Sequence, residues 1–499
     1  MKELPTHTQA SAVLPRRRSS AWTVARRFAA LALLGVIGFH SSTTTTTTSE
    51  SVLDRVYDAV HELKWKSTVL SKDPHERALQ LMDRQPVIDG HVDLEILSRY
   101  YYANDLDAFD LRKETRGQVD FPRMRKGKMG GFFHSVFVPC PEDEGYPSEN
   151  RSNFTTPTWR VRDTLEQIDT ARLLIDKYND QFELTLTARD WRKAMRRGKF
   201  GGMLGVEGGH QLGSSLSTIR TYFDLGVRYI TLTHTCHSAL ADSCGYVERP
   251  SAHDLVAGTP LAPRWNGLSS FGRTAVREMN RLGMMVDLSH TSPKTASDAL
   301  SHSLAPVIFS HSNARGVHSH SRNIPDSILR RIGSIDSRRK GTFNLSEDGE
   351  KGQGWGADTG EVDKPVPSGD VLIMLNFSPT FVSEWSDGSG PRANVSLMAD
   401  HAEYIGRLAG REHVGIGSDF DGIEDVPEGL EDVSKYPNLI AELLRRGWSD
   451  AEVMGLTSGN LLRIVEKVEA VARQHGHDKP SYEVFSGRTD LVKHDKPPI

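Results

Sequence analysis

A histidine and an aspartate two positions apart close an apolar run in the first fifth of the sequence. The run is PVIDGHVDLE, Pro86 to Glu95, and the two residues are His91 and Asp93. Side chains alternate between the two faces of a strand, so His91 and Asp93 would point the same way. Two potential ligands on one face at the end of a buried strand predict a metal site. Taken alone, the motif is equally compatible with a surface loop that carries the pair by chance.

Later apolar runs end in residues of the same chemical kind. A single histidine at such a place is more often structural than a ligand. Four histidines, two aspartates and a glutamate that all follow one positional rule are much harder to obtain by chance, and they predict one shared site. The further residues that close apolar runs are Glu207, His234, His290, His311, Asn376 and Asp419.

The residue types define the chemistry of this site. Imidazoles and carboxylates together suit Zn²⁺, and Mn²⁺ or Fe²⁺ less well. The set is too large for one tetrahedral ion. Glu207 is flanked by glycines in GVEGGH, so its carboxylate has room to bridge two ions about 3.5–4 Å apart. A water molecule shared by two such ions is a hydroxide-like nucleophile, and the sequence therefore predicts hydrolysis of a carbonyl or phosphoryl centre.

Eight strand-length runs would have to position these residues. They are nearly continuously apolar, as in parallel strands covered on both faces, and amphipathic helical stretches separate most of them. Eight strand–helix units predict an α/β fold, a (β/α)8 TIM-like barrel, with catalytic residues at the C-terminal ends of the strands. An open doubly wound sheet is the alternative, but no G-x-G-x-x-G follows the first strand. The expected strands are residues 86–93, 132–139, 201–209, 228–234, 284–290, 306–312, 371–377 and 413–422, and the expected helices include 162–178, 216–225, 270–282, 293–300 and 397–409.

The rest of the chain divides into a leader, one catalytic domain and two polar segments. Of 499 residues 37% are hydrophobic and 25% charged, and the net charge of −4 gives no basic field for nucleic acid. Residues 1–50 hold a basic and apolar leader with a threonine-rich linker, and the catalytic domain is expected over residues 73–474. Residues 335–370 are expected to form a disordered surface insertion, and residues 475–499 a polar C-terminal tail.

The leader indicates the secretory pathway. Five arginines between Arg16 and Arg27 precede FAALALLGVIGF, residues 28–39, which is shorter than the roughly 20 residues that span a bilayer. The pattern favours a signal peptide, with a short signal anchor and a disordered tail as alternatives. We therefore expect a secreted or membrane-anchored protein with its catalytic domain in the lumen or outside the cell. The glycosylation sequons begin at Asn150, Asn153, Asn344, Asn376 and Asn394.

Taken together, the motifs resemble those of the membrane dipeptidases, also called renal dipeptidases, a family of zinc metallopeptidases. The resemblance runs from about Asp73 to Val468, outside the 335–370 insertion. It rests on IDGHVD, GVEGGH, LTHTCH, NRLGMMVDLSH, PVIFSHS, SRNIPD, GSDFDG and VPEGLEDVSKYPNLIAELLRRGWS. It implies an amidohydrolase-type metal-dependent hydrolase that cleaves the peptide bond of dipeptides, L,L and also L,D, with a hydroxide that bridges two Zn²⁺ ions.

The resemblance also implies a metal-binding set. His91 and Asp93 would hold one zinc ion, and His290 with His311 the other. Glu207 would bridge both ions, which gives each ion an open position of the catalytic type.

Three further residues would act on the substrate. His234 would hydrogen-bond the developing oxyanion. Asp419 would orient the bridging water and carry its proton to the leaving amine. Arg322, in SRNIPD, would hold the free carboxylate of the dipeptide bidentately, with a surface ion pair of little consequence as the alternative.

The cysteines and the chain end differ from the mammalian pattern. Cys140 and Cys236 stand where mammalian members have a disulfide pair, so the resemblance implies that they are bonded and that Cys244 is free. No C-x-x-C sequence is present, so a thiolate metal site is not expected. The terminal HDKPPI is not apolar, so a C-terminal lipid anchor is not expected. The family also implies a homodimer. His237 stands where the family has asparagine, a change that could alter side-chain preference.

Two other functions compete with the dipeptidase. One is another binuclear barrel amidohydrolase, such as a lactonase, a phosphotriesterase-like enzyme or a deaminase. Those enzymes commonly carry His-x-His on the first strand and a modified lysine as the bridge, whereas this chain has His91-x-Asp93 and Glu207. The other is a catalytically inactive barrel that acts as a binding module, which the intact set of presumed ligands disfavours.

Overall fold

The computed structural model describes residues 65, 68–140, 159–245, 261–340, 369–384, 391–486 and 488. Ser71–Ile499 forms one compact unit, and Met1–Leu70 is a separate one. The expected leader and most of the expected 335–370 insertion lie outside the described residues. Within the described part of the chain, no helix has the length and apolar character needed to cross a membrane.

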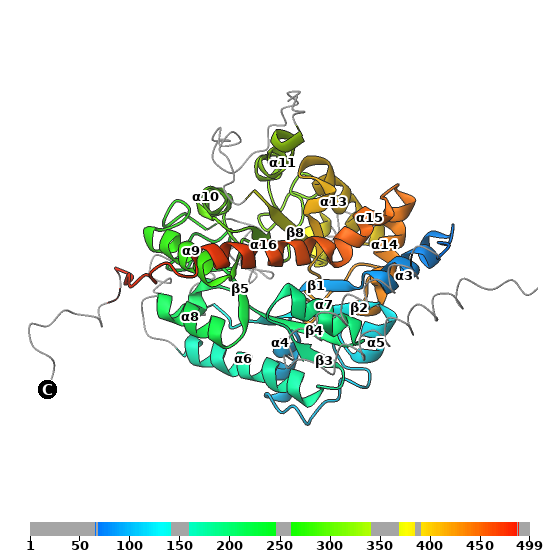
Figure 1. Ribbon diagram of the computed structural model, residues 1–499, viewed down its shortest axis with the longest axis horizontal. Helices are drawn as coiled ribbons and strands as arrows, with labels where there is room; N and C mark the ends of the chain where they lie inside the picture. Colours follow the sequence, from blue (N-terminus) through cyan, green and yellow to red (C-terminus); the bar gives the residue numbers. More distant parts are fainter. Residues whose placement is uncertain are drawn as a thin grey trace, which may run out of the picture. The chain divides into compact units, whose positions relative to one another are not determined.

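Eight parallel strands close into a barrel. Each strand pairs with the next barrel strand along the chain. In the numbering of Figure 1, β3 lies outside the barrel, so β2 pairs with β4, and the pairing of β1 with β9 closes the circle. All eight predicted strands are present, so the barrel prediction is confirmed and the open sheet was wrong. The barrel strands are β1 (Val87–Val92), β2 (Met129–Val136), β4 (Phe200–Val206), β5 (Val227–Thr231), β6 (Met285–Asp287), β7 (Val307–Phe309), β8 (Val371–Leu375) and β9 (Val414–Ile416).

A ninth strand, β3 (Phe182–Leu184), was not predicted. It extends the sheet beside the first half of β4, where Phe182 pairs with Phe200. It lacks the continuous apolar run that marked the barrel strands, because Glu183 stands between Phe182 and Leu184.

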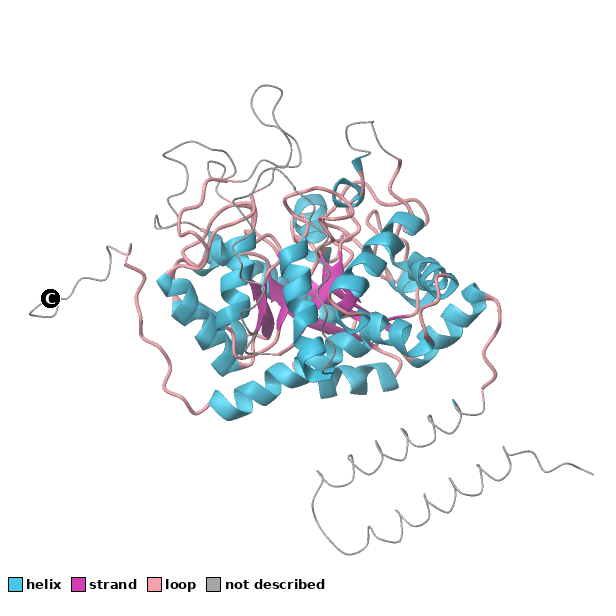
Figure 2. Cartoon of the chain, turned by 90° about the horizontal axis from the view of Figure 1, so that it is seen from above, coloured by secondary structure: helices cyan, strands magenta, loops and turns pink. Residues whose placement is uncertain are grey.

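Helices surround the strands, as Figure 2 shows. The predicted helices occur within a few residues of their expected bounds, and local signals explain why: Ser269 caps α9 by accepting from Gly272 N, and Gly283 ends it at φ 88°. The helices are α3 (Pro74–Arg84), α4 (Leu94–Tyr102), α5 (Phe121–Lys126), α6 (Arg160–Lys177), α7 (Ala188–Arg196), α8 (Leu216–Asp224), α9 (Ser270–Leu282), α10 (Pro293–His302), α11 (Asp326–Lys340), α12 (Pro379–Val382), α13 (Val395–Leu408), α14 (Tyr436–Arg445), α15 (Asp450–Met454) and α16 (Asn460–His475).

Apolar side chains close the N-terminal end of the barrel. Figure 1 shows α16 crossing in front of the strands, and its buried face, including Leu461 and Ile464, packs with the barrel residues Ile88 and Met203. Trp191 of α7 joins the same cluster and donates from its indole to the Gly130 carbonyl at the start of β2. Because this end is filled, polar chemistry is left to the opposite, C-terminal end.

Candidate metal centre and active site

The predicted site residues gather beyond the C-terminal ends of the strands. Each lies at the end of its strand or no more than a few positions after it, so the barrel itself brings together residues that are hundreds of positions apart. His91 is the penultimate residue of β1, and Asp93 directly follows that strand. Glu207 follows β4, His234 follows β5, His290 follows β6, His311 follows β7, and Asp419 follows β9.

The Glu207 carboxylate is the centre of this cluster. Its Oε1 lies 3.0 Å from His290 Nε2 and 3.2 Å from His311 Nε2. The same oxygen lies 3.5 Å from His91 Nε2 and 3.6 Å from His234 Nε2. Four imidazoles thus face one carboxylate oxygen.

These spacings fit shared cations better than direct hydrogen bonds. Ligands 2.0–2.1 Å from a tetrahedral ion stand about 3.3 Å from one another. His91 Nε2 lies 3.4 Å from Asp93 Oδ2, and although fully buried it has no hydrogen-bond partner among the described residues. His290 Nε2 and His311 Nε2 lie 3.0 Å apart. The imidazole and carboxylate donors present therefore suit a divalent ion such as zinc.

Burial and neighbouring charge shift the pKa values of these residues in different directions. Burial raises the pKa of Glu207 well above its usual value. Burial alone would lower the pKa of His91, but Asp93 and Glu207 outweigh it and raise the pKa to about 10. Burial lowers the pKa of both His290 and His311 far below the usual value. His290 and His311 are thus neutral and can offer a ring nitrogen to a cation, whereas His91 must release a proton when an ion binds.

The loop after β9 presents Asp419 in a strained conformation. Asp419 has φ 68°, a left-handed conformation that is costly for residues other than glycine. Asn376 Nδ2 donates to Asp419 Oδ2 at 2.8 Å and fixes this carboxylate. Burial raises the Asp419 pKa to about 6. His290 is likewise left-handed, at φ 62°. Such strain collects at sites where a side chain must be aimed at a ligand.

Arg322 faces the cluster with unused donors. The residue is 4% exposed, and its Nη2 donates to the His311 carbonyl oxygen at 3.3 Å. Its Nε and Nη1 have no partner among the described residues. Its guanidinium also lies over the Phe381 ring, 5.0 Å from the ring centre. A buried guanidinium without a carboxylate partner is well suited to bind an anionic group of a ligand.

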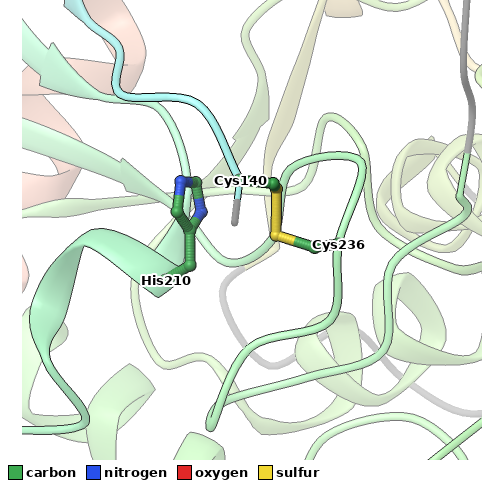
Figure 3. Close-up of side chains that lie close together, drawn as sticks. All are labelled: Cys140, His210 and Cys236. Atoms are coloured by element: carbon green, nitrogen blue, oxygen red, sulfur yellow. A yellow bond between two sulfur atoms is a disulfide. The ribbon is translucent and has the colours of Figure 1, made fainter. Parts of the chain in front are cut away.

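Cys140 and Cys236 form the predicted disulfide, with Cα atoms 6.1 Å apart. Figure 3 shows the His210 ring beside the two sulfur atoms. The three side chains have the spacing of a metal site, but sulfurs bonded to each other cannot act as thiolate ligands. His210 instead binds the Val138 carbonyl oxygen through Nε2 at 2.7 Å. Cys244 is free and buried, also as predicted.

His237 contacts the backbone through both ring nitrogens. Ser243 N donates to its Nδ1 at 3.0 Å, so its Nε2 must carry the proton that is donated to the Ala262 carbonyl oxygen, also at 3.0 Å. The residue therefore ties the loop after β5 to the chain at Ala262. Any effect of His237 on which substrate side chains are accepted would therefore act through the position of this loop.

One of the described sequons is not accessible in the folded protein. Asn376 is fully buried and occupied by its bond to Asp419, so it cannot carry a glycan. Asn394 is partly exposed and caps α13 by accepting from Leu397 N. The sequons at residues 150, 153 and 344 lie outside the described residues.

A closed (β/α)8 barrel with a buried histidine–carboxylate cluster at its C-terminal end defines the class as a metal-dependent hydrolase. The chain belongs to the membrane dipeptidase family, peptidase family M19, whose family model matches residues 75–337 and 364–479. The protein is therefore a metal-dependent dipeptidase, and none of the comparisons favours a lactonase, a phosphotriesterase-like enzyme or an inactive binding module.

The chain resembles one curated relative in sequence and two solved structures in fold. The chain is 38% identical to dipeptidase aclJ of Aspergillus oryzae over 408 residues, which cover 81% of this chain and 82% of that one. It has the fold of the probable dipeptidase PvdM of Pseudomonas aeruginosa, at 21% identity and a TM-score of 0.62, over 80% of this chain and 99% of the other. A metallopeptidase of Rhodobacter sphaeroides, solved with a phosphinate mimic of L-Ala-D-Ala, matches at 24% identity and a TM-score of 0.58, over 77% and 99% of the two chains.

Proposed function

We propose that this dipeptidase binds two Zn²⁺ ions and hydrolyses L,L and L,D dipeptides that have a free C-terminal carboxylate. The observation that carries the proposal is the position of Glu207, whose Oε1 lies within 3.6 Å of four imidazole nitrogens. One carboxylate in this position can serve two ions at once.

The proposed ligand sets follow the two sides of Glu207. His91 and Asp93, 3.4 Å apart, would hold one ion, and His290 and His311, 3.0 Å apart, would hold the other. Bound zinc ions would polarise the scissile carbonyl and lower the pKa of an attacking water molecule. Two ions also balance the buried carboxylates that otherwise raise the pKa of His91.

The remaining roles belong to side chains of the protein. Asp419 would accept the proton of the attacking water and pass it to the leaving amine, a role compatible with a carboxyl pKa of about 6. Burial lowers the pKa of His234, so its imidazole is neutral and can donate one hydrogen bond from a ring N–H to the developing oxyanion. Glu207, His234 and Asp419 are thus the proposed catalytic residues.

Arg322 would select dipeptides over longer peptides. Its two unused donors, Nε and Nη1, are suited to one carboxylate. A peptide bond placed at the metal centre would then be followed by a single residue and a free carboxylate. The dipeptide mimic bound by the Rhodobacter sphaeroides metallopeptidase supports acceptance of a D-residue at the C-terminal position.

The test is a hydrolysis assay with a panel of L,L and L,D dipeptides, combined with elemental analysis. We expect two zinc ions per chain, loss of activity with a chelator and recovery with Zn²⁺. One ion per chain, or recovery only with another metal, would contradict the zinc pair. Hydrolysis of L,L dipeptides alone would contradict the broader substrate range.

We also propose that the protein is made in the secretory pathway, with its catalytic domain in the lumen or outside the cell. The disulfide between Cys140 and Cys236 supports an oxidising compartment. Attachment through residues 28–39 and the homodimer remain predictions from the sequence. Protease protection of the domain in isolated microsomes would test the location, and light scattering would test the dimer.

A further inference from the structure

Two of the proposed metal-binding histidines contact hydroxyl groups through their second ring nitrogen. His311 Nδ1 lies 2.8 Å from Ser310 Oγ, and His91 Nδ1 lies 2.9 Å from Tyr229 Oη. All four residues are fully buried, so water does not compete for these contacts. A hydroxyl can either donate or accept, and its direction decides which ring nitrogen carries the proton.

The direction of the Ser310 contact is set by Asp287. Ser310 Oγ donates to Asp287 Oδ2 at 2.6 Å, because an ionised carboxylate can only accept. A serine hydroxyl has one hydrogen, and its contact with Ser289 Oγ is longer, at 3.3 Å. With its hydrogen used for Asp287, Ser310 can only accept from His311. His311 Nδ1 must then carry the proton, and the lone pair is left on Nε2, the nitrogen that faces Glu207.

The hydrogen count at Ser310 then closes. Its Oγ donates one hydrogen to Asp287 and accepts one from His311, which presents an unprotonated Nε2 to Glu207. Tyr229 contacts the other histidine, His91, through its hydroxyl.

Asp287 is itself held as an acceptor on both oxygens. Its Oδ1 accepts from Ser289 N at 3.1 Å and from Ser310 N at 2.8 Å. Its Oδ2 accepts from Thr231 Oγ1 at 2.6 Å, in addition to Ser310 Oγ. Two backbone N–H groups cannot reverse their direction, so Oδ1 must stay an acceptor, while Oδ2 accepts from the hydroxyls of Ser310 and Thr231.

We propose that Asp287, acting through Ser310, sets the tautomer of His311, one of the proposed metal ligands. This inference rests on the ligand assignment in the proposed function. Asp287 touches neither metal ion nor substrate in that assignment, so it is a positioning residue. The buried carboxylate would thereby leave the Nε2 of His311 free for its ion, since a protonated Nε2 cannot bind a metal.

Replacing Asp287 with asparagine should reverse the network. The amide oxygen must remain where Oδ1 is, because two backbone N–H groups point there. The amide NH₂ then takes the place of Oδ2 and donates to Ser310 Oγ, whose own hydrogen turns to His311 Nδ1. The proton of His311 moves to Nε2, which blocks metal binding there.

The experiment compares full-length, zinc-loaded protein carrying Asp287→Asn, Ser310→Ala or Tyr229→Phe in competition with a chromophoric chelator. Asp287→Asn and Ser310→Ala should weaken zinc binding about 10–100-fold at the site that His311 serves, the usual size of an outer-sphere effect. Tyr229→Phe removes the hydroxyl that contacts His91 and should leave the affinity of the His311 site unchanged. Thr231→Val is the matched control, because it removes a bond to the same carboxylate outside the route to the His311 ring. It should change affinity less than twofold.

A second readout does not depend on the loaded enzyme. Histidine ¹⁵N NMR of metal-free protein should show the proton of His311 on Nδ1 in the wild type and on Nε2 in Asp287→Asn. A wild-type His311 protonated on Nε2, or equal losses of affinity in Asp287→Asn and Thr231→Val, would overturn the inference. If Asp287→Asn does not fold by circular dichroism, the Ser310→Ala variant decides. A wild type that binds no metal would refute the proposed function, while the NMR result would still judge the network.

Discussion

Replacing Arg322 with leucine tests the basis of dipeptide selection. The guanidinium is buried, and two of its nitrogens lack partners in the described part of the chain. If these donors bind the substrate carboxylate, the variant loses two charge-assisted hydrogen bonds and leaves the carboxylate of the substrate in an apolar pocket. If Arg322 is structural, the variant loses only its contacts with Phe381 and the His311 carbonyl.

The expected magnitude follows from these contacts. A hydrogen bond to a charged group contributes about 1.5–3 kcal/mol, and two such bonds set an upper range of about 3–6 kcal/mol. Losing the charge also relieves the cost of a buried guanidinium in the free enzyme, so we expect a net loss of about 3–4 kcal/mol. That loss corresponds to a fall in kcat/KM of about 10²–10³-fold, mainly through a higher KM.

The assay pairs each dipeptide with its C-terminal amide. The wild type should prefer the carboxylate by about 10²–10³-fold, and Arg322→Leu should treat the two substrates almost equally. Arg322→Lys keeps the charge without the planar fork and should retain part of the preference. Metal content should stay unchanged in both variants. An Arg322→Leu enzyme that still prefers the carboxylate as strongly as the wild type would refute the assigned role.

Three further predictions concern metal binding and stability. Glu207→Gln should lower the occupancy of both metal sites together, because one carboxylate serves both; two zinc ions per chain in that variant, by elemental analysis, would contradict bridging. Metal binding near neutral pH should release at least one proton, since the His91 pKa is about 10 before an ion binds; affinity at this site should then fall by up to about tenfold per pH unit as the pH is lowered. Calorimetry in buffers of different ionisation enthalpy measures that proton, and a buffer-independent heat would disprove its release. Cys236→Ser should reduce the free energy of unfolding by about 2–5 kcal/mol for a closure of 96 residues, whereas Cys244→Ser should change it far less, as chemical denaturation without reductant would show.

The barrel strands could be predicted because they carry their own signals. Strands covered on both faces are continuous apolar runs, and helix ends have recognisable residues, such as Ser269 and Gly283 around α9. The candidate site followed from one rule, that polar residues closing such runs meet at one end of a barrel. That rule placed Glu207 and the histidines together without any knowledge of distances.

The residues that orient this site were missed for a physical reason. Tyr229, Ser310 and Asp287 lie within or beside apolar runs, and their contacts depend on which strands are neighbours. Pair partners across a barrel leave no trace in local periodicity. Asp287 did give a signal, since a carboxylate inside the run MMVDLSH must find buried hydrogen-bond donors. The left-handed backbone of His290 had no such signal, because that conformation is uncommon for residues other than glycine and nothing in the local pattern marks it.

A second buried aspartate, Asp89, accepts two backbone N–H groups in the same way as Asp287, which argues that such aspartates position the residues of the site. Asp89 Oδ1 accepts from His91 N at 2.9 Å and from Ser418 N of the neighbouring strand end at 3.0 Å, as Asp287 Oδ1 does with Ser289 N and Ser310 N. Strand ladders stop where the strands diverge at the rim, so the backbone N–H groups there need other acceptors. Each carboxylate accepts from the backbone N–H two residues further along its own segment and from one on the neighbouring segment, and so fixes the spacing between the two. The positions of the metal ligands are thus set by buried aspartates as well as by the sheet.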